Sequence, residues 1–224
     1  MRRFIILTEK PWHRSIISIL ESRKDEDWKL ISNKEDFNLK MLNEFKPEKV
    51  FIPHWSYIIP KSIWTVYPCI VFHMTDLPYG RGGSPLQNLI IDGKLSTKIT
   101  ALQIDAGIDT GDIYLKKDLS LSGTAIEIFK RATPIILEMI VEILENNLTP
   151  VKQKGNPVNF RRRKPEESSI SSLSRLDIIY DYIRMLDCEG YPKAFIENSL
   201  FKFEFSDAEF NNNEIIANVR ITKK

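Results

Sequence analysis

The chain has 224 residues, of which 42% are hydrophobic and 28% are charged, and such globular values exclude long disordered stretches. At this length we expect one main core with a small appendage. Lys and Arg number 32 against 30 for Asp and Glu, a net charge of +2, so the charge balance argues against a nucleic-acid partner.

The first third of the chain alternates strand-like and helix-like patterns. Phe4–Leu7 is a continuous apolar run, typical of a strand buried on both faces, and Ile16–Leu20 follows with helical spacing. Such alternation predicts an α/β fold, a Rossmann-like mostly parallel sheet with helices on both faces. No Gly-x-Gly-x-x-Gly follows the first strand, so a dinucleotide site is not indicated. The later elements are a strand at Trp28–Ile31, a helix at Phe37–Phe45, a strand at Val50–Ile52, a short helix at Pro60–Tyr67 and a strand at Cys69–Phe72.

A glycine-rich segment follows the fourth predicted strand. Met74–Gly83 contains Pro78 and several glycines, which predicts a loop with unusual backbone angles. Ser84 and Pro85 then have the residue types that begin a helix. Beyond this loop the patterns predict strands at Lys98–Ile104 and Ile113–Leu119 and a long helix over Ile126–Leu144.

The last third of the chain begins with a polar, basic stretch over residues 150–174, which predicts a surface linker. Its run Arg161–Lys164 is either a phosphate contact or a solvated loop. Leu176–Leu186 predicts a helix, and Leu200–Phe205 with Glu214–Ile221 predicts a small hairpin. The apolar spacing leaves open whether this end forms a homodimer or packs on the core.

Membrane and metal binding are not indicated. No run reaches the roughly 18 apolar residues of a spanning helix, and the apolar run near the N-terminus is too short for a signal peptide. We therefore expect a cytoplasmic protein with no membrane partner. Cys69 and Cys188 are far apart and have no metal-ligand spacing, so no metal is expected.

Two segments carry candidate chemistry, His73–Gln87 and Asp105–Asp112. Alone, His73 could cap a loop, and Asp109 before Thr-Gly could simply form a turn. Together they follow predicted strand ends, where ligands bind in such sheets. A neutral imidazole can accept or donate a proton near neutral pH, and a carboxylate beside it orients the ring. The pair therefore indicates proton transfer, provided that the two side chains converge.

These segments resemble the folate-dependent formyltransferases, a family that includes methionyl-tRNA formyltransferase, glycinamide ribonucleotide transformylase and sugar N-formyltransferases. The family's first motif runs Asn-x-His, Ser-Leu-Leu-Pro and Arg-Gly with a following Pro. It is matched by His73, Thr75, Leu77-Pro78, Arg81-Gly82 and Pro85. The second motif, Asp-x-Gly-x-Asp-Thr-Gly-Asp, is matched in full by Asp105–Asp112.

The resemblance implies the formyltransferase fold and an N-formyltransferase that uses 10-formyltetrahydrofolate, with His73 as proton shuttle and Asp109 as its partner. It implies a pterin slot lined by Trp55, Ser56, Tyr57, Asp105, Ala106, Gly107 and Ile108, although Trp55 could instead be core. For the acceptor we expect contacts from Lys10, Trp12, Thr75, Tyr79 and Arg81. Arg81 either clamps a phosphate or pins its own loop by bonding carbonyls.

The acceptor class is inferred from the branch of the family. His54–Ser56 and His73–Leu89 look closest to sugar N-formyltransferases of the pseudaminic-acid pathway type and to formylation domains of peptide synthetases. We therefore expect a nucleotide-linked aminosugar, such as a UDP-4-amino-4,6-dideoxy sugar, in surface polysaccharide biosynthesis. Methionyl-tRNA or another amine as acceptor, and a non-catalytic folate- or nucleotide-binding module, remain as alternatives. The short tail argues against tRNA.

The expected parts are a catalytic domain over 1–150 and a linker, helix and hairpin subdomain over 151–224.

One position departs from the family pattern. Val71 stands where the family has the Asn that would hydrogen-bond the developing oxyanion. A lost oxyanion donor typically costs about 10²–10³ in turnover. Either another donor replaces it, with the N–H of Gly82 or Gly83 and the side chains of Thr75 and Gln87 as candidates, or the enzyme is weak or inactive.

Overall fold

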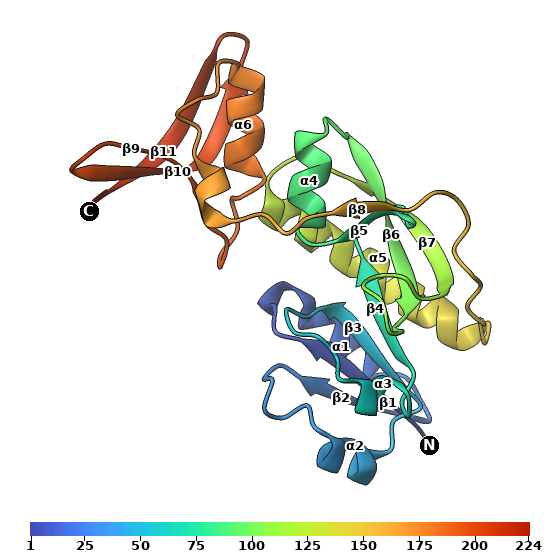
Figure 1. Cartoon of the computed structure of the whole chain (residues 1–224). Coiled ribbons are helices and arrows are strands. Elements are labelled where there is room, and N and C mark those ends of the chain that lie inside the picture. The colour runs from blue at the N-terminus through green and yellow to red at the C-terminus, as the bar shows by residue number, and fades with distance from the viewer. The chain divides into compact units, whose positions relative to one another are not determined.

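The structure, a computed structural model, describes residues Met1–Lys224, and the chain forms two compact units (Figure 1). The first unit comprises Met1–Arg81, Lys98–Leu119 and Lys130–Asn159. The second comprises Gly82–Thr97, Ser120–Phe129 and Phe160–Lys224. Each unit is thus assembled from segments that are distant along the chain.

The first unit is built on a six-stranded sheet with the order β2-β1-β3-β4-β6-β7. The pairs β1–β2, β1–β3 and β3–β4 are parallel, whereas β4 and β6 are antiparallel. The prediction of a mostly parallel sheet is therefore confirmed. The strands are β1 (Arg2–Thr8), β2 (Glu26–Ile31), β3 (Lys49–His54), β4 (Cys69–His73), β6 (Ser96–Gln103) and β7 (Ile113–Ser120).

The core explains why the central strands are apolar on both faces. All side chains from Phe4 to Leu7 are fully buried, because the neighbouring strands and the layers above and below exclude water from them. One core cluster joins Ile5, Val50 and Cys69 to Leu42 of the second helix. A smaller cluster of Leu77, Leu102 and Ile113 packs against Val71 of β4.

The α-helices follow the predicted order, with shifts of a few residues at their ends, whereas two short 3-10 helices were not predicted. The side chain of Asn38 caps α2 by accepting from the N–H of Met41 at 3.0 Å. None of the helices combines the length and the apolar character that crossing a membrane requires. The helical segments are η1 (Pro11–His13), α1 (Ser15–Leu20), α2 (Leu39–Phe45), α3 (Lys61–Trp64), α4 (Pro85–Ile91), α5 (Ala125–Glu145), η2 (Pro165–Ser168) and α6 (Leu176–Arg184).

The second unit contains α4, α6 and the predicted hairpin. Its antiparallel sheet has the order β11-β10-β9, with β9 (Ala194–Glu197), β10 (Phe201–Asn211) and β11 (Glu214–Lys223). The side-chain amide of Gln87 on α4 donates to the carbonyl of Met185 at 3.1 Å, just beyond the end of α6. Arg184 donates to the carbonyls of Leu121 and Gly123, at 2.7 and 2.9 Å. These buried bonds fix α6 within the unit.

The predicted glycine loop contains a short strand. β5 (Tyr79–Gly82) pairs with β8 (Val158–Phe160), which lies in the segment after α5. Gly80 and Gly82 have φ values of +80° and +107°, a region that favours glycine, so the predicted unusual backbone is present. At Gly82 a Cβ would lie 2.3 Å from the carbonyl oxygen of Phe160, so the pairing requires glycine there.

Candidate active site

The last residue of β4, His73, lies beside Asp109. Nδ1 of His73 is 3.5 Å from Oδ2 of Asp109, and Nε2 donates to the carbonyl of Gly80 at 2.8 Å. Because a carbonyl only accepts, Nε2 carries the proton in the neutral ring, and a further proton can add only at Nδ1, toward the carboxylate. The ring is 8% exposed. The two side chains thus converge, while their catalytic roles stay predictions.

The loop that presents Asp109 is shaped by its own motif residues. Oδ1 of Asp105 accepts from the N–H of Gly107 at 3.0 Å and from the hydroxyl of Thr110 at 2.5 Å. A Cβ at Gly111 would lie 1.7 Å from the carbonyl oxygen of Gln103, so only glycine fits. Asp109 itself has a φ of +53°. Most of the motif therefore builds a turn, and Asp109 is the member whose carboxylate faces the histidine.

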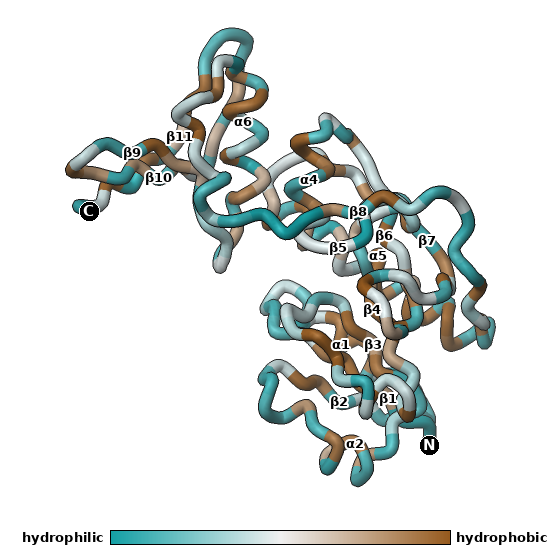
Figure 2. The backbone as a smooth tube through the Cα atoms, viewed as in Figure 1, coloured by the Kyte–Doolittle hydropathy of each residue, from teal (hydrophilic) through white to brown (hydrophobic).

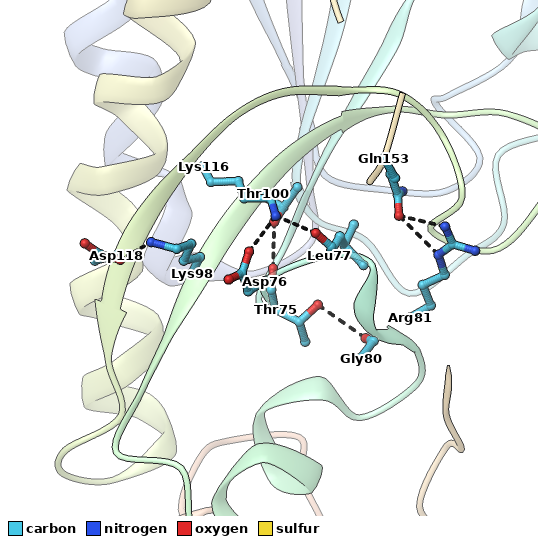
Figure 3. A network of polar contacts seen from close by, with 10 residues as sticks. All are labelled: Thr75, Asp76, Leu77, Gly80, Arg81, Lys98, Thr100, Lys116, Asp118 and Gln153. Atoms are coloured by element: carbon cyan, nitrogen blue, oxygen red, sulfur yellow. Dashed lines mark hydrogen bonds and ion pairs between the residues drawn. The ribbon is translucent and has the colours of Figure 1, made fainter. Parts of the chain in front are cut away.

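The hydroxyls of two buried threonines, Thr75 and Thr100, form hydrogen bonds to backbone carbonyls of the glycine loop. Thr75 is fully buried, and its hydroxyl donates to the carbonyl of Gly80 at 3.3 Å. Its own carbonyl accepts from the hydroxyl of Thr100 on β6 at 2.6 Å, and Lys116 binds the neighbouring Asp76 at 2.5 Å (Figure 3). The same Gly80 carbonyl thus receives both Thr75 and His73. Because Thr75 is fully buried, its side chain offers no exposed surface for the predicted contact with an acceptor.

Gln153, which sequence analysis missed, joins the two loops. Its Oε1 accepts from Nε and Nη2 of Arg81, at 3.2 and 2.8 Å (Figure 3). Its Nε2 donates to the carbonyls of Asp109 and Gly111, both at 2.8 Å. A lone glutamine in a polar segment has no sequence pattern that would single it out.

The predicted pterin-slot residues lie in the first unit on two loops. Trp55 packs against the core cluster around Ile52, the alternative that the sequence left open, and its ring is 5.4 Å from that of Tyr57. The hydroxyl of Ser56 donates to Glu9. On the other loop Ile108 is 70% exposed. Their contact with a pterin stays a prediction.

The predicted acceptor residues have partners within the protein. Nζ of Lys10 is 3.3 Å from Oε1 of Glu9 and 5.8 Å from the ring centre of Trp12. Tyr79 is half-buried on β5. The guanidinium of Arg81 is bonded to Gln153, so it pins the loop, although through a side-chain amide rather than a carbonyl of the backbone.

A pair of histidines lies at the ends of η1 and β3. The ring centres of His13 and His54 are 6.2 Å apart, and Nδ1 of His13 is 2.9 Å from the hydroxyl of Thr133. Burial, reinforced by His54, lowers the pKa of His13 to about 3. Burial, reinforced by the positive charge of Lys10, lowers the pKa of His54 to about 4. Both rings are therefore neutral at physiological pH. No group of three His, Cys, Asp or Glu side chains is placed to hold a metal ion.

Comparison with known proteins identifies the family. The model of the formyl transferase family matches residues 14–144, more than half of the chain. The chain belongs to the formyl transferase family. A second model, the C-terminal domain of methionyl-tRNA formyltransferase, matches residues 165–222. The fold and family predicted from the two motifs are confirmed.

Several relatives are similar to this formyl transferase chain. The structure of methionyl-tRNA formyltransferase from Clostridium thermocellum is 49% identical, with a TM-score of 0.97, and the match covers 100% of both chains. Methionyl-tRNA formyltransferase from Rickettsia typhi is 34% identical over 58% of this chain and 45% of its own length. That from Rickettsia felis is 27% identical over 81% and 61%. The chain thus spans about half to three fifths of these curated relatives.

A structure of a 4-N formyltransferase from Francisella tularensis has a TM-score of 0.69 at 18% identity, covering 88% of this chain and 93% of that one. At this identity the likeness shows the fold alone.

Two expectations about the acceptor are wrong. The relatives are methionyl-tRNA formyltransferases, which overturns both the nucleotide-linked aminosugar and the argument against a nucleic-acid partner. The expected role in surface polysaccharide biosynthesis depended on the sugar acceptor and is therefore wrong as well. The net charge of +2 misled because it averages over the whole surface, whereas Arg161, Arg162 and Lys164 gather locally and are exposed. The tail judged too short for tRNA matches that enzyme's own C-terminal domain.

Proposed function

We propose that this chain transfers a formyl group from 10-formyltetrahydrofolate to the amine of methionyl-tRNA. The observation that carries the proposal is the 49% identity with methionyl-tRNA formyltransferase from Clostridium thermocellum over the whole of both chains. The match of residues 165–222 with the C-terminal domain of that enzyme class supports it. Since charged tRNA is a cytoplasmic molecule, the proposed place of action is the cytoplasm.

His73 and Asp109 supply the proton chemistry of the proposed reaction. The amine attacks the formyl carbon, so a carbon–nitrogen bond forms and the oxygen becomes an oxyanion while the attacking nitrogen becomes positive. Nδ1 of His73 takes the proton of that nitrogen, and the carboxylate 3.5 Å away stabilises the imidazolium. As the intermediate collapses, the bond to the folate nitrogen breaks and that nitrogen receives the proton.

The oxyanion is proposed to have one side-chain donor fewer than in the family pattern. The side chain of Val71 packs against the cluster of Leu77, Leu102 and Ile113 and cannot donate. Three of the four candidate substitutes already donate to carbonyls of the protein: the N–H of Gly83 to Phe160 at 3.3 Å, Thr75 to Gly80 at 3.3 Å and Gln87 to Met185 at 3.1 Å. The barrier is expected to be correspondingly higher.

The remaining site assignments are part of the same proposal. The pterin is proposed to lie between the loops at residues 55–57 and 105–108, and the acceptor near Lys10, Trp12, Tyr79 and Arg81. Residues 1–150 are proposed as the catalytic domain and residues 151–224 as the part that contacts tRNA. Figure 2 shows the segment after β8 as strongly hydrophilic, and exposed arginines there suit a phosphate backbone.

The test is a direct assay with charged tRNA. The purified chain is incubated with 10-formyltetrahydrofolate and methionyl-tRNA, the tRNA is digested, and formylmethionyl-adenosine and tetrahydrofolate are measured by mass spectrometry. We expect both products in equal amounts. Free methionine and UDP- or dTDP-linked aminosugars serve as controls and should give no formamide. Formylation of a sugar without formylation of methionyl-tRNA would overturn the proposal.

A further inference from the structure

Three hydrogen-bonded links and the contact between His73 and Asp109 form a closed ring that passes through Gln153. Nε2 of His73 donates to Gly80, and the next residue, Arg81, donates twice to Oε1 of Gln153. Nε2 of Gln153 donates to the carbonyl of Asp109, whose carboxylate returns to Nδ1 of His73. Both loops that face the histidine are therefore bonded to the side chain of Gln153. Figure 3 shows its bonds to Arg81.

The Asp109 turn needs such a tie. Asp109 has a φ of +53°, a backbone region that costs a residue with a Cβ roughly 1 kcal/mol or more. The amide of Gln153 binds the carbonyls of Asp109 and Gly111, both at 2.8 Å, and so holds the backbone on both sides of Thr110. Without these bonds the turn loses the contacts that keep the carboxylate aimed at the ring.

The residue type fits this task closely. An amide side chain is an acceptor on one atom and a donor of two hydrogens on the other. The acceptor meets the guanidinium of Arg81, and the two hydrogens meet the two carbonyls. A glutamate would keep the bond to Arg81 but would set a carboxylate oxygen against the carbonyls of Asp109 and Gly111, which repel it.

We propose that Gln153 is a positioning residue, which keeps the Asp109 carboxylate beside Nδ1 of His73 while Arg81 carries the constraint to the glycine loop. The catalytic part of this inference rests on the proposed function, and the positional part does not. Gln153 acts through Asp109, so its removal should lower kcat and leave the KM for the formyl donor within about twofold.

The kinetic test compares Gln153→Glu and Gln153→Leu with Thr149→Ala, a change at an exposed residue four positions earlier that lies outside the part proposed to contact tRNA. Initial rates with methionyl-tRNA and 10-formyltetrahydrofolate give kcat and KM, and thermal unfolding verifies the fold. We expect kcat to fall on the order of 10–100-fold in both Gln153 variants and to stay unchanged in the control. Unchanged kcat in Gln153→Leu would overturn the inference.

A double-mutant cycle separates positioning from general structural support. Because Gln153 is proposed to act through Asp109, Gln153→Leu should cause little further loss of kcat when it is added to Asp109→Asn. Full additivity of the two losses would contradict the mechanism, since it would mean that Gln153 acts elsewhere.

A crystal structure of Gln153→Leu tests the positional part whether or not methionyl-tRNA is the acceptor. We expect the distance between Nδ1 of His73 and Oδ2 of Asp109 to lengthen beyond about 4 Å, the limit of an ion pair. An unaltered distance of 3.5 Å in the variant would overturn the inference even if the wild-type chain proves to use another amine.

Discussion

At the scale of single residues, the pair of His73 and Asp109 is the part of the site whose chemistry can be tested most simply. Asp109→Asn keeps the shape of the side chain and removes the charge that stabilises a protonated ring. We expect kcat to fall on the order of 10²–10⁴-fold, with a thermal midpoint close to that of the wild type. Steady-state kinetics with methionyl-tRNA, beside a melting curve, measure both. Near-normal turnover would show that Asp109 is not the partner of His73.

At Val71 a substitution is expected to raise kcat and not to lower it. Val71→Asn restores the amide that the family pattern has two residues before His73, on the same face of β4. We expect kcat to rise and the Kd of the folate to stay the same, because the amide meets the oxyanion only in the transition state. The same change places a polar group among Leu77, Leu102 and Ile113, so stability should fall by roughly 1–3 kcal/mol. Turnover assays, folate titration and urea unfolding measure the three quantities.

His13 and His54 predict how stability depends on pH. In the folded chain the pKa of His13 is about 3 and that of His54 about 4, whereas in the unfolded chain both return to about 6.5. Below pH 6.5 these two histidines bind protons in the unfolded chain but stay neutral in the folded chain. The free energy of unfolding therefore falls as the pH drops from about 7 toward 4. Above pH 7 this contribution is fully present.

Urea unfolding at pH 7.5 and pH 5.5 measures this effect. We expect the wild type to lose on the order of 1–3 kcal/mol between these two pH values, and a His13→Asn, His54→Asn double variant to lose much less. His73 is the third and last histidine of the chain and remains in the variant. An equal loss in both proteins would contradict the assignment to these two residues.

At the scale of elements, the Asp105–Asp112 loop depends on a glycine. Gly111→Ala would place a Cβ 1.7 Å from the carbonyl oxygen of Gln103, so the turn that presents Asp109 must shift. Gly93→Ala is a matched control, because its Cβ would meet nothing within 4 Å, although its φ of +69° adds some strain. We expect activity to collapse in the first variant and to persist in the second. Equal activity in the two would show that the turn tolerates the shift.

The elements that could be predicted from the sequence are those whose burial produces a recognisable pattern of apolar residues. Phe4–Leu7 and Cys69–Phe72 read as buried strands because both faces are covered. β5, β8 and β9 were not predicted, since strands of three or four residues are too short to show alternation. The partner of β5 also lies about 78 positions away along the chain, at β8, and no local pattern reports such a pairing.

At the scale of the whole molecule, the family motifs led to the fold and to His73 and Asp109, but not to the acceptor. Motifs report the chemistry that relatives share, whereas the proposed tRNA acceptor would be recognised by local surface charge, which the net charge does not report. Gln153 could not be predicted either, because its role arises only when three separate segments of the chain meet.

The most direct measurement is single-turnover formylation of charged methionyl-tRNA, with enzyme in excess and the reaction quenched at intervals. For the wild-type chain with 10-formyltetrahydrofolate we expect one formyl group per methionyl-tRNA, and for His73→Ala we expect a rate lower by at least about 10²-fold at equal tRNA binding. If the wild-type chain binds the tRNA and the folate but transfers no formyl group, or if His73→Ala transfers it at the wild-type rate, then formyl transfer to methionyl-tRNA through this histidine is ruled out.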